Sequence, residues 1–159
     1  MKQLRFHATF RLFSILAILG AVALLNPGKA AADSKDGVSY VTTVKDSNGN
    51  FASRGVIALH ADHTVSVIDS GQGGPAFLFT SQLGSWKSDG KNGVVAKTID
   101  FDYPPNAAAA RLDYTISFDG DGQVSGTITL TTFPLQANPL DGGGTVVGTF
   151  TFTGEAVKP

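Results

Sequence analysis

Beyond residue 33 the chain alternates between apolar and polar residues, and this alternation constrains the fold more than any other feature. A period of two places one set of side chains on each face of a β-strand. The alternating segments are rich in Thr, Val, Ile and Phe, and clusters of Gly, Asn and Asp separate them. We predict strands over Val38–Lys45, Phe51–His60, Thr64–Asp69, Leu83–Lys87, Val94–Tyr103, Ala110–Asp119, Gln123–Phe133 and Thr145–Val157.

The connectors between these strands carry turn chemistry. Asn48-Gly49 suits a type I′ hairpin, and the run Asp119-Gly120-Asp121-Gly122 supplies residues that tolerate a positive φ. An even number of strands joined by successive hairpins can close on itself, which leaves no exposed edge. We therefore predict an all-β protein with an eight-stranded antiparallel up-and-down β-barrel.

The residues before Asp33 have the character of a secretory signal peptide. Met1–Arg11 is basic, and the apolar run Leu12–Leu25 is shorter than the roughly 20 residues that a spanning helix needs. Ala30-Ala31-Ala32 offers small residues to a signal peptidase. We expect cleavage before Asp33, a single barrel domain over residues 33–159, no stable membrane insertion, and a secreted protein, extracellular or periplasmic. An uncleaved anchor is the alternative.

Charge and composition exclude several function classes. The leader holds four of the twelve basic residues and none of the thirteen acidic ones, so the mature chain carries a net charge of −5. This charge disfavours nucleic acid as a partner. The absence of cysteine excludes a disulfide framework, a thiolate metal site and a thiol nucleophile. No G-x-S-x-G motif and no phosphate-binding glycine loop occurs, and we predict no cofactor.

Connector lengths indicate that the two ends of the barrel differ. Successive connectors of a meander alternate between the ends, so every second connector lies at the same end. A barrel with a closed bottom and an open mouth would show one tight and one loop-rich end. The short set is Ala61–His63, Ser88–Gly93 and Gly120–Gly122, and the longer set is Ser70–Gln82, Pro104–Ala109 and Pro134–Gly144.

The alternation predicts an apolar interior and a polar exterior of Thr, Ser and Asp. An eight-stranded barrel is either filled by side chains or holds one small ligand, and both possibilities stay open. Thr98, Asp100 and Asp102 are expected outside. The residues expected inside are Phe51, Ile57, Leu59, Ile99, Phe101, Tyr103, Leu112, Tyr114, Ile116, Phe118, Val124, Ile128, Leu130, Val146, Phe150 and Phe152.

A binding site is expected at the loop-rich end. Apolar residues in its Gly- and Pro-rich loops need something to cover, either a ligand or the barrel opening. Gly142-Gly143-Gly144 could serve there as the hinge of a lid. The candidate ligand-binding residues of pocket and mouth are Phe77, Phe79, Trp86, Phe101, Tyr103, Arg111, Tyr114, Leu135, Leu140 and Phe150.

The fifth and sixth strands carry the densest group of ionisable residues. If Tyr103 pairs with Ala110, Asp102 faces Arg111 across the strands and Asp100 faces Asp113. Two facing carboxylates raise one pKa and could serve as a general acid or base. Because the apolar face of these strands predicts that all four side chains point outward, ordinary surface pairs are favoured.

Two short motifs invite a metal interpretation. His60 and His63 share one turn, but zinc wants a third protein ligand, and the turn lies at the tight end. The segments 46–50 and 119–121 resemble fragments of an EF-hand loop, but each lacks a required residue. We expect turns at these places and no metal site.

The stretch Leu59–Ser66 followed by Gly84-Ser85-Trp86-Lys87 resembles small secreted calycin-type barrels, in which an "HADGT" turn precedes a "GxW" strand. His63 stands where that pattern has Gly, and true lipocalins place GxW on the first strand. The resemblance implies a lipocalin-like barrel that binds a small apolar ligand, and it carries over no catalytic residue. The alternatives are a cyclase or isomerase of the allene-oxide-cyclase type, by analogy of fold alone, and a filled structural barrel.

Overall fold

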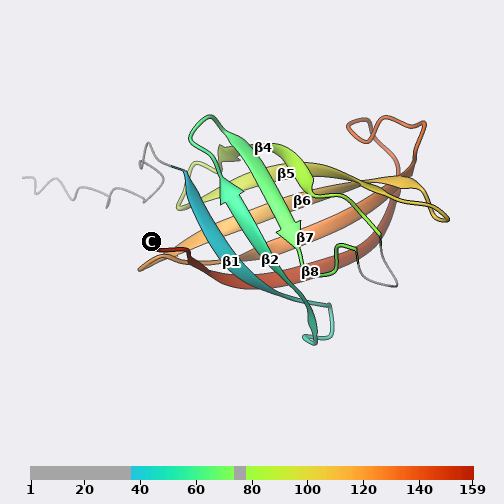
Figure 1. The fold of residues 1–159 in the computed structure, drawn as a ribbon. Coiled ribbons are helices and arrows are strands. Elements are labelled where there is room, and N and C mark those ends of the chain that lie inside the picture. Colours follow the sequence, from blue (N-terminus) through green and yellow to red (C-terminus); the bar gives the residue numbers. More distant parts are fainter. Residues whose placement is uncertain (1–36, 74–77) are drawn as a thin grey trace, which may run out of the picture.

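The computed structural model describes residues 37–73 and 78–159, which form a closed barrel of eight antiparallel strands (Figure 1). Each strand pairs with its neighbours in the sequence, and the last strand returns to pair with the first. The predicted all-β class and closed antiparallel barrel are therefore confirmed. The strands are β1 (Val38–Lys45), β2 (Phe51–Leu59), β3 (Thr64–Asp69), β4 (Gln82–Ser88), β5 (Gly93–Asp102), β6 (Ala108–Gly120), β7 (Gln123–Pro134) and β8 (Thr145–Ala156).

The predicted strand boundaries agree with these to within two residues. Gly49 has a φ of 82° and Asp121 a φ of 50°, as turn residues that tolerate a positive φ should, but Asn48 lacks the positive φ that a type I′ turn requires, so the predicted type I′ hairpin is wrong. The side chain of Asp46 accepts hydrogen bonds from the backbone N–H groups of Asn48 and Asn50, both at 2.9 Å, so this EF-hand-like segment is a hairpin turn. The described residues include no helix with the length and hydropathy needed to cross a bilayer. The predicted leader, residues 1–32, lies outside them.

The two ends of the barrel differ as the connector lengths predict. We call the end with the short connectors the tight end and the opposite one the open end. The tight end holds residues 60–63, 89–92 and 121–122, and the open end holds residues 46–50, 70–73, 78–81, 103–107 and 135–144.

The apolar core is densest at the tight end. Val65, Val94, Ile116 and Val124 are at most 2% exposed, and all of them lie within five residues of a tight-end connector. Trp86 helps to close this end: its indole N–H donates to the carbonyl oxygen of His60 at 3.0 Å, and its ring packs on His63 with the centroids 4.6 Å apart. Leu130 and Phe150, which face inward nearer the open end, are half-buried.

The register between β5 and β6 differs from the prediction. Ala110 pairs with Asp100 in place of Tyr103, a shift of three residues. A shift by an odd number of residues exchanges the two faces of a strand relative to its neighbour. The predicted facing of Asp102 with Arg111, and of Asp100 with Asp113, is therefore wrong.

The exchange of faces places the large apolar residues of β5 outside the barrel. Ile99 lies beside Arg111 on the outer face, and Phe101 and Tyr103 are 49% and 54% exposed. Small residues of β5 face inward opposite large ones of β6, as Ala96 does opposite Tyr114. The predictions that Ile99, Phe101 and Tyr103 face the axis, and that Thr98, Asp100 and Asp102 face out, are wrong. The smaller side chains of β5 fit the space inside the barrel, and its larger apolar side chains lie on the outer face.

Irregularities in strand pairing reverse two further orientations. Phe51 follows a register shift between β1 and β2, pairs with Lys45 and is 65% exposed. Val146 follows a shift between β7 and β8, pairs with Thr131 and is 62% exposed. An extra residue in one strand inverts the alternation beyond it, so the predicted inward orientation of both side chains is wrong.

The long connector between β7 and β8 packs on the outer face of the barrel. An Nη1 group of Arg111 donates to the carbonyl oxygen of Pro139 at 2.9 Å, and the guanidinium lies 5.2 Å from the ring centroid of Phe133. Phe133 is 4% exposed although its place on β7 faces outward, because the connector covers it. Leu135 and Leu140 of this connector are themselves 48% and 63% exposed.

Candidate ligand-binding site

The inner face at the open end holds a buried polar network that joins β4, β5 and β6. The side-chain oxygen of Gln82 accepts hydrogen bonds from the hydroxyl of Thr98 at 3.1 Å and from that of Tyr114 at 2.6 Å. All three side chains are buried, and burial is the main reason that the pKa of Tyr114 is raised. Each of the three side chains is carried by a strand, and the network links β4, β5 and β6 through the side-chain oxygen of Gln82.

Asp100 lies beside this network on β5 and is only 4% exposed. Its Oδ1 has no hydrogen-bond partner, and no other buried side-chain polar atom among the described residues lacks one. Burial, and to a smaller extent the charge of Asp102, raises the pKa of Asp100 to about 7. Burial also raises the pKa of Asp102. A buried acceptor without a partner is costly, so Asp100 is a candidate contact for a ligand.

Asp69 on β3 shows the opposite situation. Its Oδ2 accepts a hydrogen bond from the hydroxyl of Ser53 at 2.6 Å, and its Oδ1 accepts one from the backbone N–H of Gly71 at 2.7 Å. Both of its oxygens therefore have partners within the protein. Asp100 therefore differs from Asp69 in having a buried oxygen without a partner.

Apolar side chains form the opposite wall of the open end. Leu130 of β7 and Phe150 of β8 face inward and are half-buried, and they pack against the core below them. Phe79, in the connector before β4, forms a bridge with Asp102 and so shares the inner face of that strand's end. These inward-facing apolar groups keep some exposed surface, as Phe118 and Trp86 do towards the tight end.

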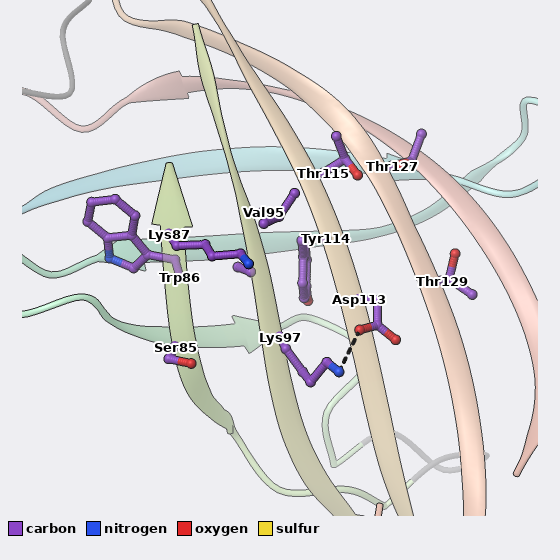
Figure 2. Close-up of a pocket in the computed structure, with 11 residues that line it drawn as sticks. Ser85, Trp86, Lys87, Val95, Lys97, Asp113, Tyr114, Thr115, Thr127 and Thr129 are labelled. Carbon is purple, nitrogen blue, oxygen red and sulfur yellow. Dashed lines mark ion pairs between the residues drawn. The ribbon is translucent and has the colours of Figure 1, made fainter. Parts of the chain in front are cut away.

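A groove of about 530 Å³ lies on the outer face, over β4 to β7 (Figure 2). Lys97 and Asp113 form an ion pair across it at 3.5 Å, and Thr115, Thr127 and Ser85 present hydroxyl groups to it. Its polar groups are exposed and solvated or paired with one another, so it offers no desolvated contact comparable with Asp100.

The structure separates the sequence-predicted site residues. Tyr114 and Phe150 face the interior, and Phe79 lies at the open end. Trp86 lies at the tight end, and Phe101, Tyr103 and Arg111 lie on the outer face. Leu135 and Leu140 are exposed in the β7–β8 connector. Phe77 lies outside the described residues.

Sequence reasoning missed Gln82, Thr98 and Asp100 as inner-face residues. The available signal was the second alternation of β5, in which Val94, Ala96, Thr98 and Asp100 occupy every other position. It was hidden because the opposite alternation carries larger apolar side chains.

The two histidines that share the β2–β3 connector make contacts with other side chains. His60 Nε2 lies 3.0 Å from the hydroxyl of Ser66, and His63 stacks on Trp86. In residues 37–73 and 78–159 no group of three or more His, Cys, Asp or Glu side chains is placed to hold a metal ion.

Comparisons with protein-family models, with curated proteins and with solved structures give no match to this chain. The fold and the site are therefore the basis for any function.

Proposed function

We propose that the protein binds one small, predominantly apolar molecule inside the barrel, at the open end. The observation that carries the proposal is that the inner face has both half-buried apolar groups, Leu130 and Phe150, and the unpartnered buried carboxylate oxygen of Asp100. Sites for small molecules are typically apolar cavities with a few fixed polar groups. The tight packing around Val94 and Val124, next to the tight-end connectors, supports a site that is closed at that end.

The polar network supports the proposal because it is pre-organised. The side-chain oxygen of Gln82 is held by hydroxyl groups from β5 and β6, which orders the wall beside Asp100 before a ligand binds. A ligand that completes the hydrogen bonding there gains affinity at little cost in protein ordering. A lipocalin-like cargo role in an exported protein is the form of this function that we favour.

Titration with the neutral fluorescent probe N-phenyl-1-naphthylamine tests the site. Phe150→Ala removes an inward ring and should weaken binding about tenfold, as expected for loss of an apolar anchor. Phe101→Ala is the matched control, because that ring lies on the outer face and is 49% exposed, and its affinity should stay within about twofold of the wild-type value. Failure of the probe to bind, or equal losses in both variants, would overturn the proposal.

Native mass spectrometry of protein purified from its own host provides an independent test. A bound small molecule, released by denaturation and lost in Phe150→Ala, supports a carrier. Only apo-protein in repeated preparations speaks for a filled structural barrel. N-terminal sequencing of the exported protein should begin at Asp33 if the leader is processed as we propose.

A second candidate function is a cyclase or isomerase reaction in the same place. It is favoured by Asp100, because a carboxyl group with a pKa of about 7 beside an apolar wall fits a general acid or base. Incubation of the protein with the molecule that co-purifies from its host decides between the two functions. Conversion by the wild-type protein, abolished in Asp100→Asn while binding persists, would identify an enzyme. An unchanged molecule would identify a carrier.

A further inference from the structure

The charges on the inner face of the barrel have one sign. Asp69, Asp100 and Asp102 face inward at the open end. The described Lys, Arg and His residues lie on the outer face or in connectors and termini. Lys97 and Arg111, for example, form ion pairs on the outer face with Asp113, at 3.5 and 2.9 Å. The inner carboxylates are therefore not neutralised by any basic side chain that the structure describes.

We propose that the ligand carries a protonated amine that binds the Oδ1 of Asp100, with its apolar body against Leu130 and Phe150. This inference rests on the proposed function. The buried oxygen needs a donor, and the surrounding charge favours a donor that is positive. The structure thus assigns a class of ligand: an organic amine with an aliphatic or aromatic tail.

Competing ligand classes fit these groups less well. A fatty acid would add a fourth negative charge beside three carboxylates, which costs free energy in a site of low dielectric. An alcohol would donate a hydrogen bond but leave the charge of Asp100 unbalanced. A metal ion would need several oxygens at once, and those of Asp69 already accept hydrogen bonds from Ser53 and Gly71.

The binding of an amine should depend on pH. The titratable groups around Asp100 are Asp102 on its own strand and Tyr114 of the network on β6, while Asp69 on β3 acts on the same Tyr114 hydroxyl, and none of them is basic. The carboxyl group of Asp100 is mostly protonated below its pKa of about 7. Affinity for an ammonium group should therefore rise as the pH increases through this value, since only the ionised carboxylate forms the ion pair.

The test is displacement of N-phenyl-1-naphthylamine from the purified wild-type protein by three competitors of equal chain length: decylamine, decanol and decanoic acid. At a pH of about 8, where Asp100 is ionised, decylamine should bind at least about tenfold more tightly than decanoic acid, in keeping with a charge-assisted hydrogen bond. In Asp100→Asn the ratio of decylamine affinity to decanoic acid affinity, measured within the same variant, should fall to about threefold or less. Asp119→Asn, at an exposed carboxylate near the tight end, is the matched control and should keep the full preference.

The outcomes separate this inference from the proposed function. Probe binding with no preference for the amine, or with a preference that Asp100→Asn leaves intact, overturns the amine assignment and leaves the apolar site standing. Absence of probe binding overturns both. A preference for the amine that grows between about pH 6 and pH 8, and disappears in Asp100→Asn, supports the assignment.

Discussion

Replacing Asp100 with Asn should make the protein more stable at neutral pH and leave its stability unchanged in acid. The carboxyl group is 4% exposed and its pKa rises from the ordinary 3.8 to about 7. The folded state therefore holds this proton more tightly than the unfolded state does. The resulting stability is fully present below a pH of about 4 and is lost as the pH rises towards 7. Asn imitates the protonated carboxyl group and carries no such dependence.

The size of the effect follows from the pKa shift. One pKa unit corresponds to about 1.4 kcal/mol, so the shift from 3.8 to about 7 corresponds to about 4 kcal/mol. We expect the two proteins to have similar free energies of unfolding at about pH 4, and Asp100→Asn to be more stable by up to about 4 kcal/mol at about pH 8.

Urea denaturation followed by circular dichroism at intervals of pH measures this difference directly. Asp119→Asn, which changes an exposed carboxylate, should differ from the wild-type protein by a small amount that does not vary with pH in this way. If the difference between wild type and Asp100→Asn stays constant over the same range, Asp100 is not a buried, unpartnered carboxyl group and the reasoning about the inner face is refuted.

Two further substitutions test the wall of the barrel. Gly84→Ala should destabilise the protein by more than about 3 kcal/mol in urea denaturation, because its Cβ would lie 1.8 Å from the carbonyl oxygen of Lys97. Gly142→Ala, which meets nothing within 4 Å, should be close to neutral, and equal effects would contradict the packing described for β4 and β5. Arg111→Ala should release the connector 135–144 from the outer face, with a loss of about 1–3 kcal/mol and faster proteolysis there, whereas unchanged protease resistance would show that Arg111 does not anchor it.

The strands and their order could be predicted because their signals are local. Alternation identified each strand, and turn residues such as Asn48-Gly49 marked the hairpins. Sequential hairpins leave few ways to pair an even number of strands, so closure followed. The asymmetry of the two ends followed in turn from connector lengths alone.

The register of β5 could not be predicted because it depends on the whole barrel. Both faces of this strand alternate, and the face with Ile99 and Phe101 is the more hydrophobic in sequence. The structure turns that face outward, beside Ala109, and keeps the smaller residues inside. The space inside the closed barrel determines which face of β5 turns inward, and the side chains of the other seven strands set that space.

The buried position of Asp100 was hidden for the same reason. A carboxylate in a strand is usually on the solvent side, so sequence reasoning placed it there. Its burial beside Gln82 and Thr98 follows from the register of β5 and from nothing in its own neighbourhood. Tyr114, by contrast, was placed correctly because the apolar alternation of β6 has one dominant face.

The proposed function requires that a ligand enters the open end of the barrel. Intermolecular nuclear Overhauser effects between decylamine and the isotope-labelled protein test this claim directly. We predict contacts from the alkyl chain to the inward side chains of Leu130 and Phe150. Contacts confined to outer-face groups such as Leu83 and Phe101, which are 65% and 49% exposed, would place binding outside the barrel and contradict the proposed function.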